Sequence, residues 1–307
     1  MTPSSGVSLV AAVECANTLG EGVVWDDRSN AALWTDIEGR TLYRTVFPFQ
    51  LVERFSTPER IGSFGLLSGR SDQLVVAFES GFALFAFESG AARWIDRPPL
   101  PSHARFNDGR VDRNGTFWAG AMIEDPALRE THTTALYRLC NGRRADKVIG
   151  GIRISNSLCW SPDGTIMYFA DTPRQAIWAF DMIDGAPKNR RVFVETPAGA
   201  YPDGSTIDAD GCLWNAQWGA GRVVRYTPDG RVDAIIETPA PNVTCVAFGG
   251  PSLQLILVTS ARAELDDNAL AKAPMSGNLF VYESPFRGLQ ESRCALAGFE
   301  TGAGAPG

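Results

Sequence analysis

The sequence predicts an all-β protein, a six-bladed β-propeller that forms one domain over residues 1–300, with a flexible C-terminal tail at 301–307. Two observations lead to this fold. The 307 residues are punctuated by 31 glycines and 19 prolines, and short runs rich in aromatic and β-branched residues lie between them, as expected of strands and tight turns. A turn-and-strand pattern then recurs at a nearly constant interval, while long amphipathic helical stretches are missing.

Six copies of this pattern align on the central residue of each strand. Four copies are clear: AALWTDI (31–37), GTFWAGA (115–121), TIMYFAD (165–171) and CLWNAQW (212–218). Two are weaker: QLVVAFE (73–79) and LILVTSA (255–261). The central residues follow one another at intervals of 42, 42, 50, 46 and 43 positions, and they are Trp34, Val76, Trp118, Tyr168, Trp214 and Leu257. A repeat of about 45 residues with several short strands is typical of a four-stranded blade.

The alternative to a propeller is an irregular β-sandwich whose aromatic strands recur by chance. In the propeller, we expect the strand near Val7 to Val13 to join the last blade and close the ring, which removes an exposed sheet edge.

Composition and charge narrow the class of protein. The hydrophobic fraction of 44% fits a globular protein with a full core, and the net charge of -7 disfavours a nucleic-acid partner, because phosphate binding needs a basic face. No segment approaches the ~18 apolar residues of a membrane helix, and the first residues lack the basic start of a signal peptide. The six cysteines are scattered without a CxxC pair, which indicates reduced thiols. We therefore expect a cytoplasmic protein without a nucleic-acid or membrane partner, either a monomer or a weak homo-oligomer.

Polar residues fall into register with the repeat. They precede the central residues of their blades by 13, 11, 12 and 11 positions, and they are Glu21, Asn107, Asn156 and Asp203. Equivalent positions in different blades lie at the same height around the propeller axis, so these side chains should converge on one mouth of the central channel.

A divalent metal explains this convergence. Carboxylates that converge repel each other unless a cation or protons intervene. Glu21, Asp203 and the amide of Asn156 make a hard oxygen site that leaves coordination positions open for water or substrate. Each residue taken alone could be a turn or capping residue, but the shared register favours the metal. The ion could be calcium, zinc, magnesium or manganese.

Five segments, spread in order through most of the chain, resemble the gluconolactonase family, which includes regucalcin, also called senescence marker protein. They are LGEGVVWDD (19–27), RFNDGRVDRNGTFWAGAM (105–122), ISNSLCWSPDGTIMYFADT (154–172), YPDGSTIDADGCLWNAQW (201–218) and NVTCVAFGG (242–250). The resemblance implies a six-bladed propeller with one divalent metal near the channel mouth, and usually the hydrolysis of sugar lactones. By motif, the metal ligands are Glu21, Asn156 and Asp203.

The same resemblance implies a substrate site. Arg105 and Asn107 match the substrate-binding pair of the family. The next substrate contact in the family is an acid shortly after the GxM segment, which here reads GAMIED, so either Glu124 or Asp125 fills this position. The stretch that follows, PALRETHTT (126–134), has no clear match, and we expect residues 123–134 to form a loop over the channel mouth that helps to select the lactone.

Lactone hydrolysis requires a polarised carbonyl and an attacking water. A metal would act as the Lewis acid, Asp203 could accept the proton of the water, and Arg105 and Asn107 would hold the sugar hydroxyls. Asp108 is interpreted as a turn residue or as support for Asn107. The substrate is expected to be an arabinono-, xylono-, glucono- or substituted hexonolactone.

Other chemistries have less support in the sequence. The only histidines, His103 and His132, belong to no recognisable nucleophilic arrangement, and no phosphate-binding glycine loop is present. Two alternatives to a lactonase stay open. One is a metal-dependent ester or organophosphate hydrolase on the same scaffold, and the other is a non-enzymatic calcium-binding propeller.

Overall fold

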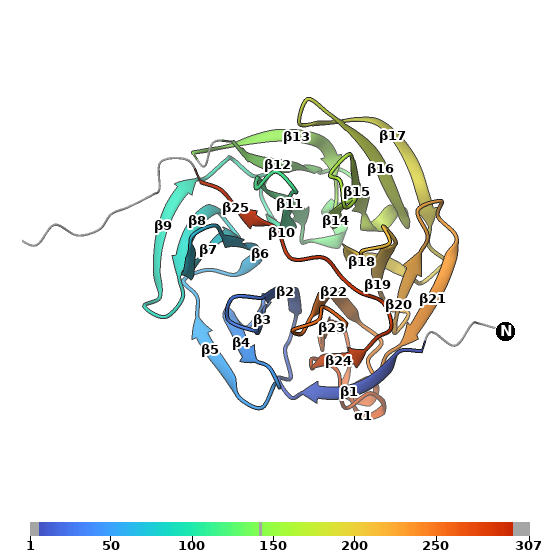
Figure 1. Ribbon diagram of the computed structural model, residues 1–307. Helices are drawn as coiled ribbons and strands as arrows, with labels where there is room; N and C mark the ends of the chain where they lie inside the picture. The colour runs from blue at the N-terminus through green and yellow to red at the C-terminus, as the bar shows by residue number, and fades with distance from the viewer. Residues whose placement is uncertain (1–5, 141–142, 297–307) are drawn as a thin grey trace, which may run out of the picture.

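The computed structural model describes residues 6–140 and 143–296, which form six sheets arranged in a ring around a central channel (Figure 1). This arrangement confirms the predicted all-β, six-bladed propeller. In each blade one strand lies next to the axis and three more follow outward, all paired antiparallel. The expected domain end at residue 300 and the tail at 301–307 lie outside the described residues.

Each blade is built from four strands, of which the first lies at the axis and the fourth at the rim. Blade 1 contains β2 (Gly20–Asp26), β3 (Ala31–Asp36), β4 (Thr41–Val46) and β5 (Val52–Ser56). Blade 2 contains β6 (Ile61–Leu67), β7 (Arg70–Phe78), β8 (Gly81–Ala86) and β9 (Ala91–Asp96). Blade 3 contains β10 (Ala104–Val111), β11 (Phe117–Ile123), β12 (Thr134–Cys140) and β13 (Arg144–Ile152).

Blade 4 contains β14 (Ser155–Trp160), β15 (Ile166–Asp171), β16 (Ala176–Ile183) and β17 (Ala186–Glu195). Blade 5 contains β18 (Tyr201–Ile207), β19 (Leu213–Trp218), β20 (Arg222–Tyr226) and β21 (Val232–Glu237). Blade 6 contains β22 (Val243–Gly249), β23 (Leu255–Ser260), β24 (Leu279–Glu283) and β1 (Ser8–Val13). The remaining elements are η1 (Pro126–Leu128), η2 (Thr172–Arg174), α1 (Asp267–Lys272) and β25 (Arg293–Cys294).

The aromatic repeat marks the second strand of every blade. Its six central residues lie in β3, β7, β11, β15, β19 and β23. The three tryptophans among them, Trp34, Trp118 and Trp214, are completely buried, and each indole N–H donates to a polar side chain. The acceptors of Trp118 and Trp214 are Asp112 and Asp208, at 2.8 and 2.9 Å. These two bonds fix the second strands of blades 3 and 5 to the turns that precede them.

The apolar core is divided into six clusters, one between each pair of neighbouring blades. Between blades 2 and 3, for example, the ring of Phe106 packs edge-on against Phe82 and Tyr137, with centroids 4.8 and 5.5 Å apart. Each cluster draws on two neighbouring blades, so every blade buries its apolar faces against its neighbours. Closure is made by β1, which pairs with β24 and confirms the expected role of the N-terminal strand.

The C-terminal residues 284–296, called the strap below, cross one end of the channel (Figure 1). Along the strap, Glu291 forms an ion pair with Arg110 at 3.3 Å, Arg293 forms one with Asp26 at 3.1 Å, and β25 pairs with the end of β6. These contacts lie where the inner strands end. The opposite end of the channel, where the inner strands begin, is called the site mouth below.

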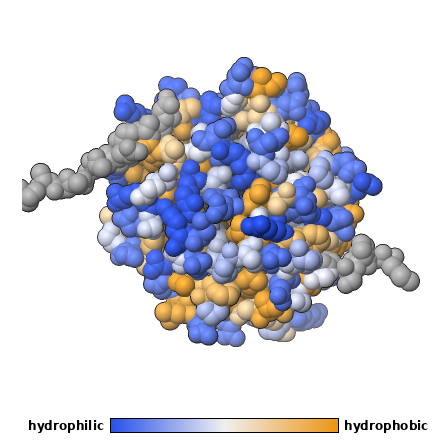
Figure 2. All heavy atoms as spheres, viewed as in Figure 1, coloured by the Kyte–Doolittle hydropathy of each residue, from blue (hydrophilic) through white to orange (hydrophobic). Residues whose placement is uncertain are grey.

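Figure 2 shows the strap face of the molecule, where hydrophilic residues gather near the centre and a band of hydrophobic atoms runs along the lower edge. The strands β1 and β5 lie along that edge in Figure 1, and the exposed apolar side chains of β1 and of the segment from β4 to β5 are Leu9, Val10, Val46, Phe47 and Leu51. All six cysteines are free thiols. Within the described ranges, the helices are too short to span a bilayer.

Candidate functional site

Four polar residues stand near the beginning of inner strands, at the site mouth. They are Glu21 in β2, Asn107 in β10, Asn156 in β14 and Asp203 in β18. In each strand the pairing with the second strand shifts register at this point, which is a β-bulge. A bulge re-aims a side chain that a regular strand would direct into the space between blades. The predicted register is therefore correct to within one position, since Asn107 and Asp203 lie within their bulges and Glu21 and Asn156 lie just before them.

The two bulges that follow Glu21 and Asn156 use left-handed backbone. Gly22 adopts φ 61° without strain, whereas Ser157 adopts φ 60° with a side chain. Ser157 is held there by its hydroxyl, which donates to the carbonyl oxygen of Asp203 at 2.6 Å. This bond also ties the strand of Asn156 to the strand of Asp203.

Glu21 and Asp203 come from distant parts of the chain, and their buried carboxyl groups lie close enough to shift each other's pKa. Burial, together with the nearby charge of Asp108, raises the pKa of Glu21 to about 8. Burial and the charge of Glu21 raise the pKa of Asp203 well above its ordinary value. Without a cation, the pair therefore holds at least one proton at neutral pH.

Two oxygens at this point lack adequate partners. Asp203 Oδ1 is buried and makes no hydrogen bond, and Asn156 Oδ1 accepts only a long bond of 3.4 Å from Asn107 Nδ2. Asn156 Nδ2 donates to Thr172 Oγ1 at 2.8 Å, which fixes the orientation of the amide. Two carboxylates and one amide oxygen fit a divalent cation that prefers oxygen ligands. In the described part of the chain, no group of three or more His, Cys, Asp and Glu residues forms a metal cluster, so the candidate set depends on the amide of Asn156.

Arg105 and Asn107 form the wall beside this set. Arg105 is 4% exposed, and its Nη1 donates to Asn107 Oδ1 at 2.7 Å and to the Phe106 carbonyl at 2.9 Å. Asn107 Nδ2 donates to the Ser155 carbonyl at 3.0 Å. Among the described residues Arg105 Nη2 has no hydrogen-bond partner, so it is the donor that remains for a bound molecule.

Asp108 does not hold Asn107, contrary to the expectation from the sequence. Its Oδ2 instead accepts the backbone N–H of Leu158 at 2.9 Å, in the bulge that follows Asn156. Burial raises the pKa of Asp108. Asp108 thus supports the strand that carries Asn156, and Arg105 is the residue that supports Asn107.

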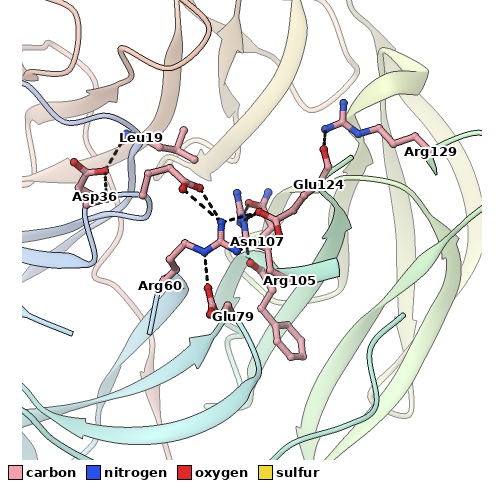
Figure 3. Close-up of polar contacts among 11 residues, drawn as sticks. Leu19, Asp36, Arg60, Glu79, Arg105, Asn107, Glu124 and Arg129 are labelled. Carbon is pink, nitrogen blue, oxygen red and sulfur yellow. Dashed lines mark hydrogen bonds and ion pairs between the residues drawn. The ribbon is translucent and has the colours of Figure 1, made fainter. Parts of the chain in front are cut away.

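Glu124 and Asp125, which the sequence could not separate, point to different places. Glu124 accepts from Arg105 Nε at 3.2 Å and from Arg60 Nη1 and Nη2 at 2.7 and 3.0 Å (Figure 3). Burial alone would raise the pKa of Glu124, but the bonds and charges of Arg60 and Arg105 together outweigh burial, and the pKa is lowered. Asp125 caps η1 by accepting from Ala127 N at 2.9 Å. Glu124 is therefore the acid that adjoins Arg105.

The loop between β11 and β12 begins at the site mouth, as its position after Glu124 requires. Arg129 folds back over the start of the loop and donates to the carbonyls of Ile123 and Glu124, both at 2.9 Å (Figure 3). A role of this loop in choosing the lactone stays a prediction. His103 is exposed and His132 is half-buried, and a His132 ring nitrogen lies 2.8 Å from Thr131 Oγ1.

Arg60 is the site-mouth residue that the sequence did not indicate. It immediately precedes β6, the inner strand of blade 2, and it lies 16 positions before Val76 rather than 11 to 13. Its guanidinium contacts carboxylates of three blades (Figure 3). A charged residue at the start of an otherwise apolar inner strand, IGSFGLL, is the signal that could have found it.

Comparison with known proteins identifies the family. Residues 19–262 match the sequence profile described as SMP-30/Gluconolactonase/LRE-like region. The chain belongs to this family. Among its members, an L-arabinolactonase of Azospirillum brasilense is 38% identical over 95% of this chain and 97% of its own length. A 6-deoxy-6-sulfogluconolactonase of Pseudomonas putida is 36% identical over 89% of this chain and 94% of its own length.

The SMP-30/gluconolactonase/LRE fold is also found in solved structures. The calcium-binding protein regucalcin from Agrobacterium tumefaciens superposes with a TM-score of 0.87 at 32% identity, over 94% of this chain and 98% of that chain. The resemblance inferred from the five sequence segments is thus confirmed. It places the protein among relatives that are named sugar lactonases and regucalcins.

Proposed function

We propose that the protein is a sugar lactonase that depends on one divalent cation and converts an aldonolactone and water into the aldonic acid. The observation that carries the proposal is the buried Asp203 Oδ1, which has no partner although it lies in a carboxyl pair beside the amide of Asn156. Glu21, Asn156 and Asp203 would hold the cation. When bound, it would polarise the lactone carbonyl and make water more acidic.

The residues of the chain have distinct tasks in this reaction. Asp203 accepts a proton from the attacking water as the water oxygen bonds to the carbonyl carbon. When the ring C–O bond then breaks, Asp203 returns this proton to the departing ring oxygen, which becomes a hydroxyl group. Arg105 Nη2 donates to the substrate and orients the ring, because its other donors are already engaged. Asn107 keeps Arg105 in place through the 2.7 Å bond.

The polar character of the mouth favours a sugar lactone over an aryl ester or an organophosphate. The residues around Arg105 are hydrogen-bonding groups, namely Arg60, Asn107 and Glu124. A hydroxylated ring can bind Arg105 Nη2 and the side of Glu124 that stays open, whereas an apolar ester would leave both without a partner. The name of the L-arabinolactonase relative makes arabinonolactone the first substrate to try.

The experiment is an acid-release assay with purified protein on a panel of lactones that contains arabinono-, xylono-, glucono- and galactonolactone. Each lactone is assayed as prepared, after chelation, and after calcium, zinc, magnesium or manganese is restored. We expect hydrolysis that chelation abolishes and that at least one cation restores. A protein that binds the cation but hydrolyses no lactone would favour the non-enzymatic calcium-binding propeller. Faster turnover of aryl esters or organophosphates, assayed beside the lactones, would favour the ester or organophosphate hydrolase.

A further inference from the structure

Arg60 stands at the site mouth without a role in the reaction described above. It is the last residue before β6. It therefore lies near the start of the inner strand of blade 2, as Glu21, Asn156 and Asp203 lie near the start of the inner strands of their own blades. Its side chain is 20% exposed. A half-buried guanidinium at this position needs partners that justify its desolvation.

The partners of Arg60 are three carboxylates from three blades. Nε donates to Glu79, which follows β7, and Nη1 donates to Glu38 at 3.1 Å, which follows β3. Nη1 and Nη2 donate to Glu124, which follows β11, at 2.7 and 3.0 Å. Arg60 thereby commits Nε–H, both hydrogens of Nη1 and one of Nη2, which is four of the five N–H groups of a guanidinium.

Because four of its five N–H groups are engaged, Arg60 has little capacity to bind a substrate directly. A guanidinium already surrounded by carboxylates cannot receive an anionic group of a substrate without losing one of them. Around it, three carboxylates face the two guanidiniums of Arg60 and Arg105. An acidic substituent of a substrate would therefore meet the carboxylates that surround Arg60, which disfavours such a substrate there.

The bidentate contact fixes Glu124 instead. Glu124 Oε1 accepts from both Arg60 and Arg105, while Oε2 accepts from Arg60 alone and keeps room for another donor. The Glu124 side chain is 34% exposed, so a bound molecule can reach it. A carboxylate held ionised in one orientation is a ready acceptor for a hydroxyl group.

On the basis of the proposed function, we infer that Arg60 is a positioning residue for specificity. It holds Glu124 as the acceptor of a hydroxyl of a neutral, polyhydroxylated lactone. It acts through Glu124 and does not touch the reacting carbonyl. Its substitution should therefore weaken substrate binding and leave the metal site and the chemical step largely intact.

The test is a double-mutant cycle on Arg60→Lys and Glu124→Gln. Arg60→Lys keeps the charge but cannot make the bidentate contact. Kinetics are measured on the aldonolactone that wild type hydrolyses fastest, with the cation saturating. We expect each single variant to raise KM by about 10-fold, with kcat changed less than about 3-fold, and the double variant to be no worse than Glu124→Gln alone.

Arg44→Lys is the matched control. Arg44 contacts Glu53 through Nε and Nη2, at 2.6 and 2.9 Å, and its side chain is 21% exposed, but it lies in β4, away from the site mouth. The Arg44→Lys variant should lose a bidentate ion pair, as Arg60→Lys does, but its KM for the lactone should equal that of wild type. Additive losses in the cycle, or an equal rise of KM in Arg44→Lys, would overturn the inference.

A matched pair of lactones tests the charge argument. D-Glucono-1,4-lactone and D-glucaro-1,4-lactone differ by a neutral hydroxymethyl group and a carboxylate. Wild type should prefer the neutral lactone in kcat/KM, and Glu124→Gln should narrow that preference. A wild-type preference for the acidic lactone would overturn the inference while leaving the lactonase intact, whereas a wild type inactive on all lactones would overturn the proposed function and the inference with it.

Discussion

Glu21 of blade 1 and Asp203 of blade 5 bring two buried carboxyl groups close together inside the site mouth, although 182 positions separate them in the sequence. Two carboxyl groups in such a contact cannot both be ionised without a compensating charge. Either protons or a cation must therefore supply that charge. The two possibilities have opposite consequences for stability, which makes them easy to distinguish.

The metal-free protein should become less stable as the pH rises. Burial raises the folded-state pKa of Glu21 from 4.5 to about 8, so the stability that its protonated form contributes is fully present below pH 4.5 and is lost as the pH approaches 8. Thermal unfolding of chelated protein between pH 5 and 8 should show a falling Tm. A saturating cation should remove most of this fall, because it replaces the proton.

Glu21→Gln should act in opposite directions on the two forms of the protein. At pH 8 it removes a buried acid that is costly to ionise, so the Tm of the metal-free variant should exceed that of metal-free wild type. The added cation should then raise the Tm of the variant much less than that of wild type. Equal stabilisation of both proteins by the cation would contradict the place of Glu21 in the ligand set.

Asp203→Asn should separate chemistry from binding. The amide keeps an oxygen of similar reach but cannot accept the proton of water, so kcat should fall by about 10²-fold or more with the cation saturating. Metal content is measured on the same samples to exclude simple loss of the ion. If the variant turns over at nearly the wild-type rate, Asp203 is neither the base nor an essential ligand.

Arg105→Ala should mostly affect the substrate. It removes the free Nη2 donor and the support of Asn107 Oδ1, but no proposed ligand of the cation, so KM should rise by about 10-fold or more while the protein retains its bound metal. Asn107→Ala leaves the guanidinium present and should give a smaller rise. Loss of metal in Arg105→Ala would contradict this separation, because it would show that cation binding also depends on Arg105.

The aromatic repeat made the blades predictable, because one large buried residue per second strand is a local requirement of every blade. Trp118 shows the requirement fully, since it is completely buried and its N–H reaches Asp112, six residues earlier. The register of Glu21 and Asp203 followed from the same periodicity. All of these positions depend on contacts within one blade.

Contacts between blades were not predictable in the same way. Asp108 was assigned to its neighbour Asn107, but its partner is Leu158, 50 positions away in the next blade. Arg60 was missed because its three carboxylate partners lie in three blades and because it lies 16 positions before Val76, outside the register of the other polar residues. Spacing along one strand carries no information about which side chain of another blade comes within reach.

Asp112→Ala should test how far the Asp–Trp bond holds the blade together. Asp112 is 5% exposed and accepts the N–H groups of Trp118, Asn114 and Thr116, so its loss should lower the free energy of unfolding by about 2–4 kcal/mol. Asp163→Ala is the control, since Asp163 accepts comparable turn bonds at the surface, and it should cost much less. Denaturant unfolding measures both, and equal effects would show that the indole bond contributes little.

The most direct test of the account is calorimetric titration of chelated wild-type protein with calcium, zinc, magnesium and manganese, while lactone hydrolysis is measured at each point. We expect one cation bound per chain, activity that rises in proportion to occupancy, and loss of this binding in a variant that combines Glu21→Gln with Asp203→Asn. Full lactonase activity in protein verified to be free of metal, or unchanged cation binding in that variant, would contradict it.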